Sequence, residues 1–129
     1  MLGAARNSDT YRCAISINGI VDLEMQKTVG VFGDKDFRVA QIGSDPEKMK
    51  RDSPLQNVAK INIPVLLVHG TKDWIVQSEH TDAMERALER EGKDYDTVII
   101  KNGGHDLERR SDRITLLKEV EGFLAENLK

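Results

Sequence analysis

The clearest hydrophobic pattern in the sequence is the uninterrupted apolar run at 65–68, which precedes the stretch His-Gly-Thr-Lys and then Asp73. Continuous rather than alternating hydrophobicity is typical of a central strand in a parallel sheet, because such a strand is covered on both faces. Residues 12–17 and 95–100 read as two further strands, the first of them short and buried. The pattern therefore predicts a parallel sheet whose middle strand ends at a loop that carries a carboxylate.

Helical periodicity predicts helices on either side of these strands. Residues 1–6 read as the last turn of a helix, and Ser78 is expected to cap a helix that ends before Gly92. The apolar side of that helix is formed by Ala83, Met84, Ala87 and Leu88. Ser111 is expected to cap a final helix. One face of the final helix is predicted to carry Ile114, Leu117, Val120, Phe123, Leu124 and Leu128.

The order strand, helix, strand, helix favours right-handed βαβ units and a three-layer, parallel-sheet α/β fold. A chain of 129 residues is long enough for one domain with its own core, so residues 1–129 are expected to form a single unit. Residues 18–57 read as an irregular connecting region with glycines at 30, 33 and 43 and a short helix at 47–51. Three strands are few for a parallel sheet, so the fold is expected to be incomplete.

Composition narrows the function classes. The net charge is −3 and basic residues alternate with acidic ones, which argues against a nucleic-acid partner. No apolar stretch approaches the roughly 20 residues that span a bilayer, and no signal-type segment opens the chain, so we expect a cytoplasmic protein without a membrane partner. A larger parent protein could carry targeting information of its own. Cys13 is the only cysteine and is expected to be a buried structural thiol. The three histidines have no metal-ligand spacing, so no metal or cofactor is expected.

Two residues with catalytic chemistry follow neighbouring strands of the predicted sheet. Asp73 comes shortly after the strand at 65–68, and His105 follows the strand at 95–100. Side chains beyond the carboxyl ends of parallel strands collect at one edge, where a carboxylate can orient an imidazole that acts as a general base. Taken singly, Asp73 reads as a turn residue and His105 as a solvated loop residue. Together, on consecutive loops, they favour catalysis.

The chain resembles the C-terminal part of the α/β-hydrolase catalytic domain of prolyl oligopeptidase-like serine peptidases, the group that includes dipeptidyl and acylaminoacyl peptidases. The residues that carry the resemblance are Tyr-Arg-Cys-Ala-Ile-Ser at 11–16, Ser-Pro-Leu at 53–55, Ile-Pro-Val-Leu-Leu-Val-His-Gly at 63–70 with Asp73, Gly-Lys at 92–93, Gly-His at 104–105 and Phe-Leu at 123–124. The resemblance implies an incomplete α/β-hydrolase-like fold in which Asp73 is the triad acid and His105 the triad base. It also implies that Trp74 and Val76 line the rim of the site.

The family's nucleophile motif is missing from this sequence. The family carries its serine on a G-x-S-x-G elbow before the strand that corresponds to 12–17, and no G-x-S-x-G occurs in the 129 residues. The serines at 8, 16, 44, 53, 78 and 111 occupy a predicted strand, turns and helix caps. A further departure is His80-Thr81, where the family often has Gln-Ser. The sequence therefore predicts the C-terminal segment of a serine hydrolase, of peptidase or esterase type, that is inactive alone.

Two other readings remain. In one alternative interpretation the chain is a non-catalytic binding or assembly module. It forms a homodimer, or recruits a complementing chain, through an exposed sheet edge at 12–17, because unpaired strand edges attract partners. A flavodoxin-like or dinucleotide-binding half-fold is disfavoured, because no G-x-G-x-x-G follows any predicted strand.

Overall fold

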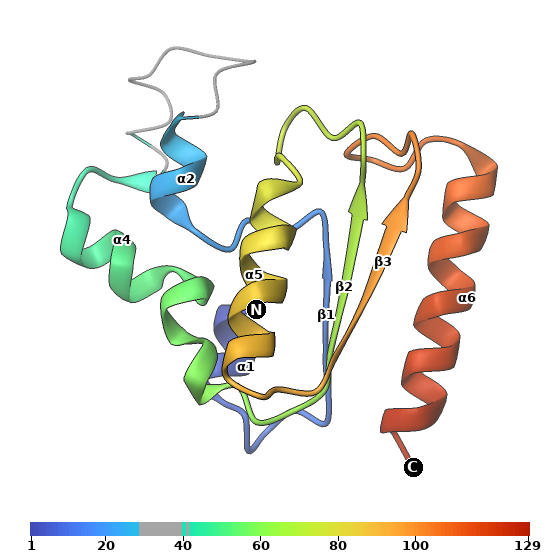
Figure 1. Ribbon diagram of the computed structural model, residues 1–129, viewed down its shortest axis with the longest axis horizontal. Helices are drawn as coiled ribbons and strands as arrows, with labels where there is room; N and C mark the ends of the chain where they lie inside the picture. Colours follow the sequence, from blue (N-terminus) through green and yellow to red (C-terminus); the bar gives the residue numbers. More distant parts are fainter. Residues whose placement is uncertain (29–39, 41) are drawn as a thin grey trace.

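The computed structural model describes residues 1–28, 40 and 42–129, and within them three parallel strands form the centre of the molecule (Figure 1). The strands lie in the order β1-β2-β3, with bounds β1 (Ala14–Ile17), β2 (Val65–Gly70) and β3 (Tyr95–Ile100). Both pairings are parallel, and Leu67 lies between Ser16 of β1 and Thr97 of β3. Every residue of β2 is buried, which confirms the predicted central strand.

Helices cover both faces of the sheet (Figure 1). The helical segments on one face include α1 (Leu2–Arg6), the 3-10 helix η1 (Pro54–Lys60) and α5 (Glu79–Arg90). On the opposite face lies α6 (Arg110–Asn127). The fold is therefore the predicted three-layer, parallel-sheet α/β arrangement.

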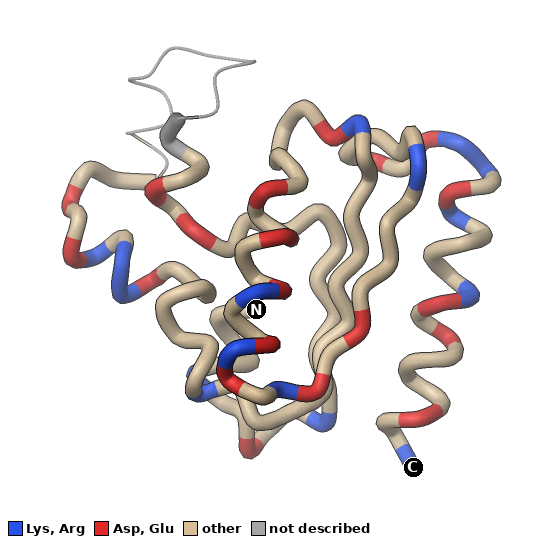
Figure 2. Tube along the Cα trace, viewed as in Figure 1, with Lys and Arg blue, Asp and Glu red and all other residues tan. Residues whose placement is uncertain are grey.

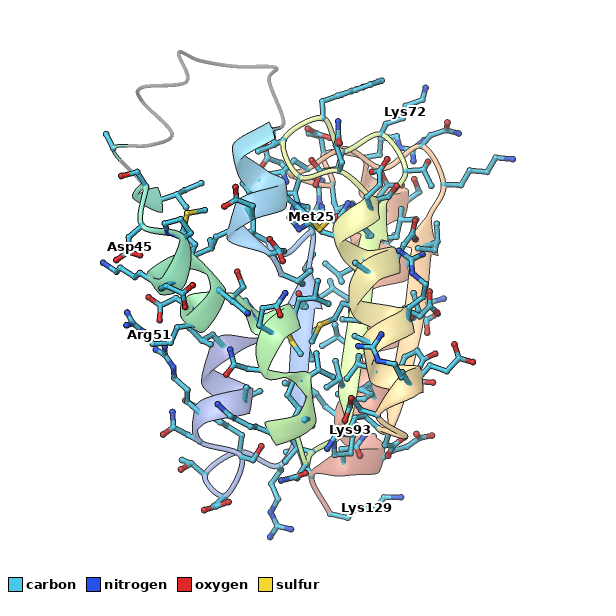
Figure 3. All side chains as sticks on the ribbon, turned by 60° about the vertical axis from the view of Figure 1, so that its left-hand side comes forward. Met25, Asp45, Arg51, Lys72, Lys93 and Lys129 are labelled. Carbon is cyan, nitrogen blue, oxygen red and sulfur yellow. The ribbon has the colours of Figure 1, made fainter. Side chains whose placement is uncertain are left out.

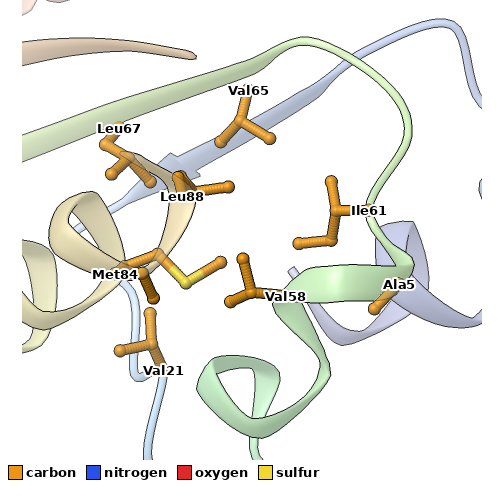
Figure 4. Close-up of a cluster of buried hydrophobic side chains, with 9 residues drawn as sticks. Ala5, Val21, Val58, Ile61, Val65, Leu67, Met84 and Leu88 are labelled. Atoms are coloured by element: carbon orange, nitrogen blue, oxygen red, sulfur yellow. The ribbon is translucent and has the colours of Figure 1, made fainter. Parts of the chain in front are cut away.

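The two faces of β2 supply two separate hydrophobic clusters, because side chains alternate along a strand. Val65 and Leu67 pack against Met84 and Leu88 of α5 on one side (Figure 4). That cluster also contains Ala5, Val21, Val58, Ile61 and Ala87. The cluster on the α6 side contains Leu66, Val68, Ile100, Leu107 and Phe123. β2 is thus fixed from both sides, which holds the loop that follows it in a defined place.

The region 18–57, read from the sequence as irregular, contains the short helices α2 (Leu23–Thr28) and α4 (Pro46–Asp52) and the start of η1 among its described residues. The predicted helix at 47–51 corresponds to α4, and the Asp45 side chain caps it by accepting from two backbone N–H groups. The helix α2 was not predicted. Asp22 stabilises its first turn in the same way. The predicted turn glycines at 30 and 33 lie outside the described residues.

The strand at 12–17 is less buried than predicted. β1 spans 14–17 and lies at an edge of the sheet, with β2 as its neighbour, so Ile17 is 44 % exposed. Cys13 is half-buried rather than buried, and it packs against the cluster on the α6 side. A short apolar run indicates burial of at least one face, but only the arrangement of strands decides whether the second face is covered as well.

The ends of the two long helices differ in detail from the prediction. Ser78 occupies the N-cap position of α5, but its side chain makes no capping hydrogen bond. Gly92 follows the helix with a φ of +60°, as expected for a C′ glycine. α6 begins at Arg110, so Ser111 lies inside the helix, where its hydroxyl donates to Asp112. The prediction that Ser111 is a cap is therefore wrong.

The predicted apolar face of α6 is divided between core and solvent. Phe123 is buried and Val120 packs beside it, whereas Leu117 is 65 % exposed. Ile114 and Leu128 are also exposed. The apolar residues of α6 spread around the helix circumference, and a helix that lies on a sheet buries only the stripe that faces it.

The charged residues follow no single-sign stripe (Figure 2). Acidic and basic side chains alternate along the helices, as the mixed sequence pattern indicates. No helix among the described residues is long and apolar enough to cross a membrane.

Candidate active site

The loops after β2 and β3 lie at the same end of the molecule (Figure 1). Lys72, in the loop after β2, marks this end, and Lys93 and Lys129 lie at the opposite end (Figure 3). Because β2 and β3 are adjacent and parallel, their carboxyl ends meet at one edge of the sheet. The structure therefore brings the two predicted site residues, Asp73 and His105, to one place.

Asp73 is held in a fixed orientation by backbone donors. Its side chain is fully buried, and Oδ1 accepts from the backbone N–H groups of Ile75 at 2.8 Å and Val76 at 2.9 Å. The backbone N–H of Asp73 donates to Gly70 O at 3.0 Å, which closes the turn after β2. Oδ2 is left to face His105. The two N–H groups fix the orientation of the carboxyl group, so this turn aims Oδ2 at the imidazole.

The imidazole of His105 completes the pair. Its Nδ1 lies 2.7 Å from Oδ2 of Asp73, and the side chain is 31 % exposed. A carboxylate can only accept, so Nδ1 carries the proton in the neutral ring and donates it to Asp73. The lone pair is then on Nε2. The arrangement is that of an oriented general base with one buried and one accessible side.

The two loops are joined by backbone hydrogen bonds. The N–H of Thr71 donates to Ile100 O at 3.1 Å, and the N–H of Lys72 donates to Gly103 O at 2.8 Å. In return, the N–H of Asn102 donates to the hydroxyl of Thr71 at 2.8 Å. These bonds continue the pairing of β2 and β3 beyond the sheet, so the loops form one unit.

A second histidine, His69, supports the acid from within β2. It is 1 % exposed, and its Nε2 donates to Val76 O at 3.0 Å. Its Nδ1 then accepts from the hydroxyl of Thr81 at 2.7 Å. Nε2 also lies 3.9 Å from Oδ2 of Asp73. Sequence reasoning placed no function on His69, although its position beside the end of the central strand is a signal that it would be buried near the site.

His80 binds Gln26 of α2, and Gln26 contacts the acid loop, which follows β2 and carries Asp73. Its Nε2 donates to Oε1 of Gln26 at 3.1 Å, and its Nδ1 accepts from the N–H of Val21 at 3.3 Å. The Gln26 side chain in turn donates to Ile75 O at 3.1 Å, inside the turn that holds Asp73. Burial lowers the pKa of His80 below its usual value, more than the nearby carboxylate of Asp22 raises it. His80 lies four residues before Met84 on the buried side of α5, and this spacing is the signal that could have found it.

The predicted rim residues separate in the structure. Trp74 is 66 % exposed beside the acid, as a rim residue would be. Val76 is 2 % exposed, so the prediction that it lines the rim is wrong. Its backbone N–H donates to Asp73 and its carbonyl accepts from His69, so the residue lies beneath the acid rather than at the surface. No cluster of potential metal ligands occurs within the described ranges.

None of the serines in the described part of the chain hydrogen-bonds to His105. Ser8, Ser53 and Ser111 bond elsewhere, to Ala4 O, Met49 O and Asp112 respectively. Ser16 lies in β1, and Ser78 stands at the start of α5. The arrangement can therefore orient a base and stabilise its protonated form, which are the roles of two members of a three-residue triad.

The chain is similar in sequence to known peptidases. The model of the prolyl oligopeptidase family matches residues 1–129. The acylamino-acid-releasing enzyme of Arabidopsis thaliana is 27 % identical over 95 residues, which cover 73 % of this chain and 12 % of that enzyme. The peptidase YtmA of Bacillus subtilis (strain 168) is 37 % identical over 76 residues, which cover 56 % of this chain and 30 % of YtmA. The chain thus spans less than a third of these relatives.

A solved structure agrees with these matches. The acylaminoacyl peptidase of Pyrococcus horikoshii, in an orthorhombic crystal form, superposes with a TM-score of 0.88 and 26 % identity over 98 % of this chain and 22 % of that chain. The chain therefore belongs to the prolyl oligopeptidase family, of which it is a serine-peptidase-type segment with the predicted incomplete α/β-hydrolase fold.

Proposed function

We propose that the chain supplies the acid and the base of a Ser-His-Asp triad, Asp73 and His105, to a hydrolase of peptidase or esterase type. The single observation that carries the proposal is the 2.7 Å contact between His105 Nδ1 and Asp73 Oδ2, with Asp73 fully buried and His105 partly open to solvent. Membership of the prolyl oligopeptidase family supports the assignment.

The proposed chemistry assigns both proton transfers to Nε2 of the imidazole, while Nδ1 stays hydrogen-bonded to Asp73. As a serine Oγ attacks the substrate carbonyl, Nε2 of His105 takes its proton, and the resulting imidazolium donates through Nδ1 to Asp73. When the tetrahedral intermediate breaks down, Nε2 returns the proton to the leaving group. The nucleophile is expected on a G-x-S-x-G elbow, which these 129 residues do not contain. The 129-residue chain by itself is accordingly proposed to be inactive.

A fluorophosphonate probe tests this proposal. The 129-residue chain is expected to show no labelling, whereas a longer product that includes a G-x-S-x-G elbow should be labelled on that serine. In the longer product, His105→Ala should lower turnover by about four to six orders of magnitude. Asp106→Ala, at the exposed next residue, should leave turnover within about twofold of the parent. Labelling of any serine in the 129-residue chain, or full activity of His105→Ala, would refute the assignment.

A second candidate function is an assembly module, and the edge of β1 favours it. In the described residues β1 pairs with β2, and the N–H groups of Ala14 and Asn18 donate to Pro64 O, just before β2, and to Val68 O within it. The intervening N–H groups of Ile15 and Ile17 consequently point to the open side. Ile17 is 44 % exposed there. An open apolar edge suits strand addition by a second copy or by a complementing segment.

Sedimentation equilibrium at micromolar concentration tests the assembly module. A dimer is expected for the unmodified chain, and Ile17→Lys should shift it to monomer, because a lysine on an edge strand opposes pairing. Leu117→Lys, at a side chain of α6 that is 65 % exposed, is the control and should leave the dimer intact. A monomeric unmodified chain would contradict homodimerisation.

A further inference from the structure

Asn18 lies where the end of β1 meets the loops of the proposed acid and base. Its Oδ1 accepts from the backbone N–H of Gly70 at 2.9 Å, and its Nδ2 donates to His105 O at 2.7 Å and Gly104 O at 3.3 Å. The residue is 4 % exposed. One buried amide thus binds the end of β2 with its oxygen. Its nitrogen binds the histidine loop, which follows β3 and carries His105.

The backbone of Asn18 is fixed independently of its side chain. Its N–H donates to Val68 O at 2.9 Å, so the residue continues the β1–β2 pairing. Its φ of 48° lies in the left-handed region, which asparagine enters more easily than most residues with a side chain. This turn ends the strand and directs the amide across the end of β2 toward the loop after β3, although β1 and β3 are not neighbours in the sheet.

Asn18 binds a part of the histidine loop that the other hydrogen bonds between the two loops do not reach. The backbone bonds that join the two loops involve Ile100, Asn102 and Gly103 on the histidine side. The carbonyl of His105 accepts from Asn18 Nδ2, and no other hydrogen bond to it is found within the described residues. The peptide that carries the imidazole is therefore held from the side of β1.

We propose that Asn18 is a positioning residue that fixes the His105 backbone, so that Nδ1 stays in hydrogen-bond contact with Asp73. This inference rests on the proposed function of His105 and adds a residue to it. Freeing the His105 carbonyl allows its peptide to rotate, which moves the imidazole relative to the rigid Asp73 turn. An error of about 1 Å in such a group is enough to weaken a hydrogen bond and to slow catalysis strongly.

The amide group of Asn18 meets requirements that similar side chains do not. Aspartate has nearly the same shape and keeps the acceptor for Gly70 N–H, but it places an oxygen against two carbonyl oxygens. Glycine tolerates the positive φ and removes all three bonds. Asn18→Asp therefore replaces the two donated bonds by repulsive contacts and keeps the third bond, and Asn18→Gly removes the whole side chain without adding backbone strain.

Nuclear magnetic resonance of the His105 ring measures the effect directly. In the unmodified chain at pH 8, we expect an Nδ1–H proton that exchanges slowly with solvent. Asn18→Asp, which loses two hydrogen bonds, and Asn18→Gly, which loses three, should each accelerate this exchange at least about tenfold. The matched control is Asn102→Asp, because Asn102 also has a left-handed φ of 59° but is exposed. It should change the exchange rate less than twofold.

Three outcomes would overturn the inference. One is unchanged Nδ1–H exchange in folded Asn18→Asp or Asn18→Gly protein. Another is an equal acceleration by Asn102→Asp, which would show that any change in these loops has the same effect. The third is exchange of the Asn18 Nδ2 protons, in the unmodified chain, as fast as that of a free amide. This measurement needs no variant, so it decides the question even if both Asn18 variants unfold. These exchange measurements do not depend on a nucleophile. The inference about Asn18 can therefore be refuted while the labelling test supports the proposed function, and the proposed function can be refuted while the exchange measurements support Asn18.

Discussion

Gly70→Ala should separate the acid loop from the histidine loop, because the two backbones approach most closely at this residue. A Cβ atom at position 70 would lie 2.4 Å from the carbonyl oxygen of Gly103, whereas ordinary van der Waals contact begins at 3.4 Å. Gly103 C and Gly104 O would lie 2.7 and 3.0 Å away. All three atoms are backbone, so no side-chain rotation relieves the contact, and the backbones must move apart by about 1 Å.

The cost follows from two effects. Overpacking of a tight site costs about 1–3 kcal/mol. A separation of this size also weakens the bond from Lys72 N–H to Gly103 O, now 2.8 Å long, which contributes about 1 kcal/mol. We therefore expect Gly70→Ala to lower the free energy of unfolding by about 2–4 kcal/mol. This is a large part of the stability of a small domain.

Urea denaturation followed by circular dichroism measures this loss. With a slope typical of small domains, the midpoint should fall by roughly 1–2 M. The matched control is Gly122→Ala, in the middle of α6, where an added Cβ meets nothing within 4 Å. That variant should be more stable by about 0.5–1 kcal/mol, because alanine is the better helix former. A Gly70→Ala protein within about 0.5 kcal/mol of the unmodified chain would refute the close approach of the two loops.

Three further predictions concern stability. Burial lowers the pKa of His80 in the folded chain. The unfolded chain therefore binds more protons than the folded chain just below about pH 6.5. The free energy of unfolding should fall as the pH drops from that value through the folded pKa. His80→Gln should flatten this part of a plot of the urea midpoint against pH. The hydroxyl of Thr97 is buried without a partner in the described part of the chain, so Thr97→Val should raise the urea midpoint by the equivalent of about 1 kcal/mol. Asp45→Ala should cost about 1 kcal/mol in the same assay, because the cap of α4 is lost, and no change would show that the cap does not form.

The sequence by itself determined the centre of the fold and the members of the candidate site. The continuous apolar run at 65–68 can be buried only if both faces of its strand are covered, so it identifies the central strand, β2, directly. Asp73 and His105 follow consecutive parallel strands, and the geometry of parallel sheets places such residues at one edge. Both conclusions depend on local order along the chain, which the sequence contains.

The tertiary structure alone decided which elements lie beside one another. The open edge of β1 and the exposed apolar residues of α6 depend on which strands and helices lie next to them. Hydrophobic periodicity indicates that a residue is buried but does not identify the element that it packs against. Asn18 contacts Gly70 and His105, and His80 contacts Gln26 of α2, so these bonds join residues that are far apart in the sequence. A polar side chain near a strand end or on a helix looks the same in the sequence whether it faces water or a buried carbonyl, because its bonding partners are assembled only when the strands and loops meet.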